Sequence, residues 1–129
     1  MLLANYLGMS GYNCNGNLIT PRSDEIMLKK LNNYQILSKP DTDYLLSLMQ
    51  NTNEEGLIPP ALPKGAVIHH KYGWYDSNPD HVLNDTAIIN YQGKTYYLSI
   101  YTNSPNHPDY NNQVNAIHNI VKALFKNNK

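Results

Sequence analysis

The sequence is poor in cysteine, in large aromatic rings other than tyrosine, and in long apolar runs. Among its 129 residues there are one cysteine, one phenylalanine and one tryptophan. Cys14 therefore has no partner for an internal disulfide, and it is either a buried or a solvent-facing thiol. No run of about 18 apolar residues occurs, which argues against a membrane span. Residues 1–4 are too short and lack the basic start of a signal peptide, so we expect no targeting signal here.

The charges are few and balanced. Ten basic residues offset ten acidic ones, so no excess of positive charge indicates binding to nucleic acid or to an anionic membrane. The length and the hydrophobic content of 41% fit one globular domain with a real core. Eleven tyrosines and many asparagines favour strands and polar loops over a helical bundle.

Helical patterns fill the first half of the chain. Apolar residues recur at helical spacing over residues 24–34, behind Ser23 or Asp24 as a cap. A second helix is predicted to begin at Ser38, with Pro40 in its first turn. It ends before the loop 51–60. We therefore predict two short amphipathic helices.

Strand patterns follow. Residues 66–71, 86–91 and 95–102 read as strands, and Gln92-Gly93 predicts a tight hairpin between the last two. A final helix starts at residue 109 or 111 and reaches about residue 125. The predicted fold class is α+β: two helices, a three-stranded antiparallel sheet and a C-terminal helix packed on it.

Lys71 is the first candidate for a functional residue. It is predicted to end its strand one residue ahead of a turn that contains Gly73. A cation there, followed by a residue that lets another chain approach the backbone, is suited to an anionic, peptide-like substrate. Alone the pattern is weak, because lysines at strand ends are usually just solvated.

Four segments together resemble a known family. They are Leu62-Pro63-Lys64-Gly65, His70-Lys71-Tyr72-Gly73, Asn84-Asp85-Thr86-Ala87-Ile88-Ile89 and Tyr97-Leu98-Ser99-Ile100-Tyr101-Thr102. They are similar to the last three strands of the class A β-lactamases and penicillin-recognising serine hydrolases. Leu18-Ile19-Thr20-Pro21-Arg22 resembles the segment that precedes a helix in that family. The resemblance runs from about Tyr6 to the last helix and corresponds to the C-terminal portion of the catalytic domain.

The resemblance implies a truncated β-lactamase/transpeptidase-like fold. Residues 1–129 would form a single partial domain, with 1–60 as part of an α lobe and 61–129 as the last strands and the C-terminal helix. The implied partner is the missing N-terminal half of the same domain. The implied location is extracellular or associated with the cell wall.

The implied reaction is attack by a serine on an amide carbonyl, which gives an acyl-enzyme and needs no cofactor. The substrate would be a β-lactam, as in antibiotic resistance, or a peptidoglycan stem peptide. Lys71, Tyr72 and Gly73 match the family's third motif and would bind the substrate: Lys71 attracts its carboxylate, and Gly73 lets it lie along the strand. The backbone N–H of Trp74 would be one donor of the oxyanion hole.

Departures from the family matter as much. None of the seven serines has a lysine three residues later, and no Ser-x-Asn precedes the third motif. The glutamate-containing loop of class A enzymes is also missing, because residues 12–18 hold no carboxylate. The third motif reads Lys-Tyr-Gly instead of Lys-Thr-Gly, and the longer Tyr72 side chain is expected to obstruct the carboxylate site partly. We therefore predict that this chain alone is inactive and that the nucleophile lies outside it.

Three interpretations stay open: part of a serine hydrolase, a degenerate non-catalytic member that binds cell-wall peptides, and an unrelated small α+β interaction module. No metal site is predicted, because His69 and His70 are neighbours on a strand and point to opposite faces. Asp85 is expected to fix the turn into its strand and not to transfer protons.

Overall fold

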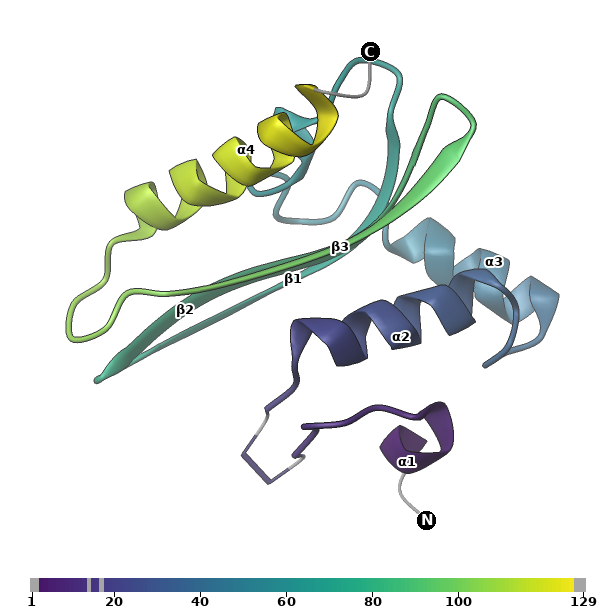
Figure 1. Cartoon of the computed structure of the whole chain (residues 1–129), viewed down its shortest axis with the longest axis horizontal. Coiled ribbons are helices and arrows are strands. Elements are labelled where there is room, and N and C mark those ends of the chain that lie inside the picture. The colour runs from purple at the N-terminus through teal and green to yellow at the C-terminus, as the bar shows by residue number, and fades with distance from the viewer. Residues whose placement is uncertain (1–2, 14, 17, 127–129) are drawn as a thin grey trace.

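The fold is a three-stranded antiparallel sheet with helices on both faces. In the computed structural model, which describes residues 3–13, 15, 16 and 18–126, helices α1 (Leu3–Leu7), α2 (Pro21–Asn32) and α3 (Lys39–Leu48) come first. A 3₁₀ turn η1 (Pro59–Ala61) leads into strands β1 (Val67–Ser77), β2 (Asp80–Tyr91) and β3 (Lys94–Asn103), and helix α4 (Tyr110–Lys126) is the last element described. Figure 1 shows α4 on one side of the sheet and α2 on the other, with α1 beyond α2. The α+β prediction is confirmed. Cys14 lies outside the described residues.

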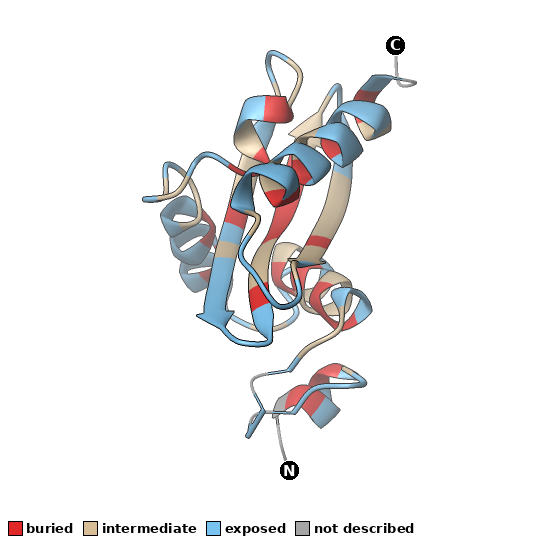
Figure 2. Ribbon diagram, turned by 90° about the vertical axis from the view of Figure 1, so that its left-hand side faces the viewer, coloured by how far each residue is buried: buried red, intermediate tan, exposed pale blue. Residues whose placement is uncertain are grey.

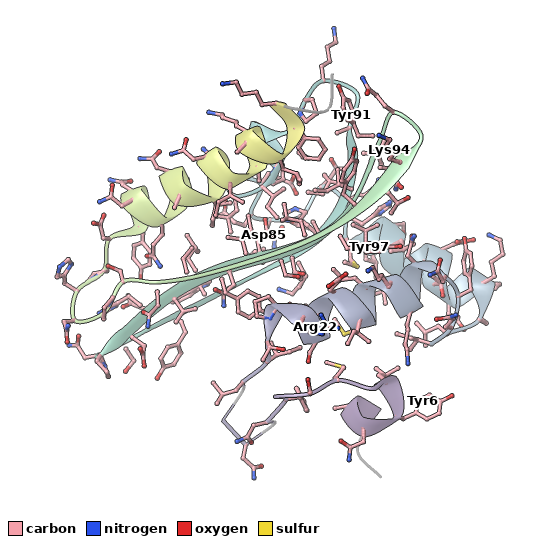
Figure 3. All side chains as sticks on the ribbon, viewed as in Figure 1. Tyr6, Arg22, Asp85, Tyr91, Lys94 and Tyr97 are labelled. Carbon is pink, nitrogen blue, oxygen red and sulfur yellow. The ribbon has the colours of Figure 1, made fainter. Side chains whose placement is uncertain are left out.

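The two faces of the sheet support separate cores. On one face α4 contributes Ile117, Val121 and Phe125, which pack with Ala87 and Ile89 of β2. On the other face Leu28 and Leu31 of α2 pack against Ile88. Because side chains alternate across a strand, neighbouring residues of β2 serve opposite cores. Figure 2 shows buried residues along the middle of the sheet and on the inner sides of the helices, and Figure 3 places Asp85 toward α4 and Tyr97 toward α2.

The helix starts are set by side-chain caps. Ser38 caps α3 as predicted, since its hydroxyl accepts a hydrogen bond from the Asp41 N–H at 3.4 Å. The cap of α2 is Thr20, whose hydroxyl accepts from the Ser23 N–H at 3.2 Å, and Pro21 is the first helical residue. The prediction of Ser23 or Asp24 as that cap is wrong, because both lie inside the first turn of α2.

The first two strands are longer than predicted. β1 runs through Gly73 to Ser77 and pairs with β2 in an unbroken antiparallel register from Val67↔Asn90 to Ser77↔Asp80. The predicted turn at Gly73 is wrong, because the chain reverses at Asn78 and Pro79 instead. The second hairpin is confirmed: Gln92 (φ 50°) and Gly93 (φ 74°) both take the left-handed conformation of a two-residue turn.

Asp85 lies in the middle of β2, where it pairs with Tyr72 of β1 and Ile100 of β3. The expectation that it fixes a turn is wrong, because β2 begins earlier, at Asp80. The Asp85 side chain is fully buried and accepts a hydrogen bond from the Ile58 N–H at 3.1 Å. It therefore joins the segment before η1 to the sheet.

Candidate active site on the edge of strand β1

β1 is an edge strand, and it carries Lys71, Tyr72 and Gly73, the predicted substrate-binding residues. The strand order is β1-β2-β3, so only one side of β1 is paired within the sheet. The His70 N–H donates to the Met49 carbonyl at 2.8 Å, away from β2. Backbone groups alternate in direction along an antiparallel strand, so those of Tyr72 and Trp74 also point outward. The Trp74 N–H is therefore directed to the outer edge, in the orientation that an oxyanion donor or a substrate strand needs.

The Lys71 side chain is exposed and lies at this edge. Its ammonium group donates to the Tyr72 carbonyl at 2.5 Å and lies 4.6 Å from the centre of the Tyr72 ring. This arrangement combines a hydrogen bond with a cation–π contact. Lys71 is thus not buried beneath α4, and its charge is available at the edge of the strand.

The edge borders a largely apolar groove between the sheet and helices α2 and α3, with a volume of about 570 Å³. Lys71, Tyr72 and Gly73 all line this groove, together with Leu28 of α2 and Met49 after α3. An apolar groove with a few convergent polar groups is the usual form of a small-molecule site. The structure thus brings the three predicted substrate-binding residues together. Trp74 is 67% exposed and does not line the groove, so the group that it presents at this edge is its backbone N–H.

Gly73 leaves space that this chain does not use. A Cβ atom placed on it would meet no other atom within 4 Å, and its φ is not in the left-handed region. Neither crowding within the chain nor backbone conformation therefore requires glycine at this position. The space beside Gly73 is open to a molecule from outside the chain, such as an extended peptide that lies against β1.

Tyr72 differs from the expectation for it. Its ring is partly buried and packs against the core on the α4 side of the sheet. The predicted obstruction of the carboxylate site by a protruding phenol is thus not what the structure shows. Tyr72 instead holds the ammonium of Lys71 through its ring and its carbonyl.

A polar network that the sequence did not reveal lines the groove on the α2 side. Asp24 of α2 is 5% exposed, and its carboxylate accepts a hydrogen bond from the Tyr101 hydroxyl of β3. Thr86, opposite Lys71 in the sheet, lies 2.5 Å from Ser99 between their hydroxyl oxygens. Burial raises the pKa of Asp24, although hydrogen bonds from Tyr101 and Thr86 oppose this. Burial, then the hydrogen bond to Asp24, raises the pKa of Tyr101. Helical spacing alone gives no sign of this network, because its members meet only in three dimensions.

A second polar cluster lies on the α4 side, directly behind Lys71. His70 is fully buried, and its Nδ1 lies 2.9 Å from an Asp85 carboxylate oxygen. Its Nε2 lies 3.2 Å from Glu55. On the other side of β1, the His69 Nδ1 contacts the Leu46 carbonyl at 2.7 Å. Among the described residues, no group of three or more His, Cys, Asp or Glu side chains is arranged to hold a metal ion.

Comparison with known proteins now decides the family. The model of the β-lactamase enzyme family matches residues 3–127, nearly the whole chain. The chain belongs to the β-lactamase enzyme family. None of the curated proteins compared with it matches significantly. In the described part of this family member, no helix is long and apolar enough to cross a membrane.

Solved structures agree with the family assignment. The TLA-1 extended-spectrum β-lactamase is 30% identical, with a TM-score of 0.74 over 85% of this chain and 41% of its own. A PBP-A variant, described as an acyl-enzyme complex with penicillin G, is 22% identical, with a TM-score of 0.77 over 95% of this chain and 48% of its own. A β-lactamase from Chitinophaga pinensis is 19% identical, with a TM-score of 0.81 over 98% of this chain and 53% of its own. This β-lactamase-family chain thus spans about half the length of the structures that it matches.

Proposed function

We propose that this chain forms the substrate-binding wall of a serine hydrolase of the β-lactamase type. Its substrate is a β-lactam or an amide of a peptidoglycan stem peptide. The observation that carries the proposal is the outer edge of β1, where the outward Trp74 N–H follows Lys71 and Gly73 beside an apolar groove. Charge, space and backbone donors needed to hold an anionic acyl compound thus converge on one strand edge.

Each edge residue has a role in this proposal. The Lys71 ammonium binds the carboxylate of the substrate, and the small Gly73 lets the substrate lie antiparallel to β1. The Trp74 N–H donates to the carbonyl oxygen as it gains negative charge. Tyr72 contributes its backbone at the edge, while its ring steadies the ammonium of Lys71.

The nucleophile is proposed to come from outside these residues. The sequence has no Ser-x-x-Lys, and the matched structures are about twice as long. The serine oxygen would add to the amide carbonyl and the C–N bond would break with protonation of the nitrogen; water would then hydrolyse the ester. The remaining half of the domain would cover the groove and the free edge of β3. A location outside the cell or in its wall follows from such substrates.

The penicillin acyl-enzyme described for PBP-A supports the substrate class, since that protein shares this fold. A second candidate is a non-catalytic member that binds cell-wall peptides without turnover. The Tyr72 contact favours it, because part of the lysine's charge is already satisfied within the chain. The family match leaves no support for an unrelated interaction module.

Binding can be tested separately from catalysis. In an NMR titration with benzylpenicillin, we expect the amide signals of Gly73 and Trp74 to shift, and Lys71→Ala to weaken this response at least several-fold. Lys94→Ala, at the first residue of β3 beside the second hairpin, is the matched control and should bind like the parent. Unchanged signals at millimolar ligand, or equal binding by both variants, would contradict the proposal. Covalent labelling with a fluorescent penicillin, once the remaining half of the domain is supplied, would separate a hydrolase from a binder.

A further inference from the structure

A buried histidine joins two carboxylates from different parts of the chain. The fully buried His70 lies on β1. Its Nδ1 is 2.9 Å and 3.2 Å from the two carboxylate oxygens of Asp85 on β2, and its Nε2 is 3.2 Å from a Glu55 oxygen. Thr52 places its hydroxyl 3.2 Å from the same Nε2. Both ring nitrogens therefore face oxygen atoms, and the ring is enclosed by anionic groups.

The same cluster fastens the segment between α3 and η1 to the sheet. Glu55 accepts hydrogen bonds from the Thr52 hydroxyl at 2.9 Å and from the Thr52 N–H, and so closes a turn over His70. At the other end of the segment, the Asp85 carboxylate accepts a hydrogen bond from the Ile58 N–H at 3.1 Å. These polar contacts to His70 and Asp85 add to the apolar packing of Leu57 and Ile58, which are buried in the core on the same face.

This fastening is next to the candidate substrate edge. His70 precedes Lys71, and its N–H donates along the outer edge of β1 to the Met49 carbonyl, where the segment begins. The outward N–H of Trp74 lies on the same edge, four residues later. The segment and the edge are thus linked in two ways: by the hydrogen bond from the His70 N–H to the Met49 carbonyl, and by the peptide bond between His70 and Lys71.

We propose that His70, with Asp85 and Glu55, is a proton-dependent clasp that positions the 49–58 segment and the substrate-binding edge of β1. This proposal rests on the proposed function of that edge and deepens it by adding its regulation. When His70 is protonated, both nitrogens donate to carboxylates and the segment is held. When His70 is neutral, Nδ1–H still donates to Asp85, but Nε2 becomes an acceptor. Nε2 then faces the Glu55 carboxylate without a proton between them, and only the Thr52 hydroxyl can still bond to it.

The direction of the pH dependence follows from the charges around the ring. Burial alone would lower the pKa of His70, but hydrogen bonds and charge attraction from Asp85 and Glu55 outweigh it and raise the pKa above 6.5. The Asp85 carboxylate comes from β2, and the Glu55 carboxylate comes from the segment between α3 and η1. Helix α4, which packs on the same face, brings His118, whose Nε2 lies 2.9 Å from the Gly56 carbonyl. A raised histidine pKa stabilises the clasp at low pH, and the stabilisation is lost as the pH rises through that pKa.

NMR can follow the clasp without any substrate. With the whole chain titrated between pH 5 and 9, we expect the His70 ring signals to titrate with a midpoint above 6.5. The amide signals of Lys71 and Trp74 should shift with the same midpoint. Glu55→Gln, at a side chain that is 43% exposed, should lower both midpoints together. Glu25→Gln, at a partly exposed glutamate on α2, is the matched control and should leave both midpoints unchanged.

Three results would overturn the clasp. They are a His70 midpoint below 6.5, a titration of His70 that leaves the Lys71 and Trp74 amides flat, and an equal response to Glu55→Gln and Glu25→Gln. A second variant, His70→Gln, should abolish the titration of both amides while retaining a hydrogen-bonding side chain. Because none of these readouts uses a ligand, the two failures can be told apart. Failed penicillin binding with an intact His70 titration would overturn the proposed function, whereas a failed His70 titration would overturn the clasp alone.

Discussion

At the scale of single residues, Tyr72 determines what the ammonium of Lys71 contacts. The ring offers its face to the ammonium at 4.6 Å, and the carbonyl offers a hydrogen bond. A threonine in this position, as in the family motif, would keep the carbonyl but remove the ring. The lysine would then be freer to meet a carboxylate in the groove.

We therefore predict that Tyr72→Thr tightens binding of benzylpenicillin. Loss of an exposed cation–π contact of about 0.5–1 kcal/mol corresponds to a gain of roughly two- to five-fold in affinity. The measurement is an NMR or calorimetric titration at constant pH. Tyr72→Phe keeps the ring and should bind like the parent, and a thermal melt of each variant controls for lost packing. Weaker binding by a folded Tyr72→Thr variant would show that the tyrosine assists the lysine.

Asp24 gives a second prediction at this scale, because its pKa is raised in the folded chain, whereas the pKa of a folded aspartate is usually lowered. Burial raises its folded pKa above the ordinary 3.8. At a pH between the ordinary value and the raised folded-state pKa, Asp24 has lost its carboxyl proton in the unfolded chain but keeps it in the folded chain. Unfolding then releases a proton, so the contribution of Asp24 to stability falls as the pH rises through this window. Asp24→Asn should remove that dependence while its amide oxygen still accepts from Tyr101.

The expected result is that Asp24→Asn gains stability relative to the parent as the pH rises from 3.8 through the raised pKa of folded Asp24. Urea unfolding of both proteins at several pH values measures the difference, and the titration of His70 cancels because both proteins contain it. Glu25→Gln serves as the control. Lys29 lowers the pKa of Glu25, so the contribution of Glu25 to stability rises with pH, opposite to that of Asp24. If the parent instead became more stable relative to Asp24→Asn as the pH rises, the pKa of Asp24 would not be raised in the folded chain.

At the scale of elements, the starts of the helices can be tested directly. Thr20 caps α2 through one hydrogen bond to the Ser23 N–H. Thr20→Ala should therefore destabilise the fold by about 1 kcal/mol, whereas Thr20→Ser should lose much less. Urea unfolding checks both variants. Equal stability of the parent and Thr20→Ala would mean that another group satisfies the first turn of α2.

The elements also show where the sequence was informative. Hydrophobic spacing predicted α4, and the Gln92-Gly93 turn predicted the second hairpin, because both signals are local. The length of β1 could not be predicted from Gly73, because a glycine in a strand resembles one in a turn until pairing with β2 is known. The cap of α2 was placed three or four residues late, because Ser23 and Asp24 resemble caps as strongly as Thr20 does.

The candidate site divides in the same way. Lys71, Tyr72 and Gly73 could be found because they adjoin in sequence and match a motif. Asp24, Tyr101 and the partners of His70 come from distant segments, and only the folded chain brings them together. Local chemistry was thus predictable, whereas the networks that support it were not.

At the scale of the whole molecule, two surfaces besides the outer edge of β1 lack a covering element among the described residues. One is the outer edge of β3, since the sheet order β1-β2-β3 leaves it unpaired within the described residues. The other is the groove between the sheet and helices α2 and α3, which is lined in part by the exposed Leu37 and Leu45. Leu48, the last residue of α3, is also exposed. Unpaired strand edges and contiguous apolar surface both favour association.

We therefore predict that the isolated chain self-associates in a concentration-dependent way. Under the proposed function, a second polypeptide that supplies the other half of a β-lactamase-type domain should convert it into a complex of defined size, because the same surfaces would then be buried once. Analytical ultracentrifugation over a range of concentrations measures both effects. Leu48→Glu, at a side chain that is 58% exposed, should reduce self-association, and Ile120→Glu on the outer face of α4 is the matched control. A sharp monomer with cooperative melting at all concentrations would show that the chain tolerates these surfaces in water, and that the groove needs no second half to be stable.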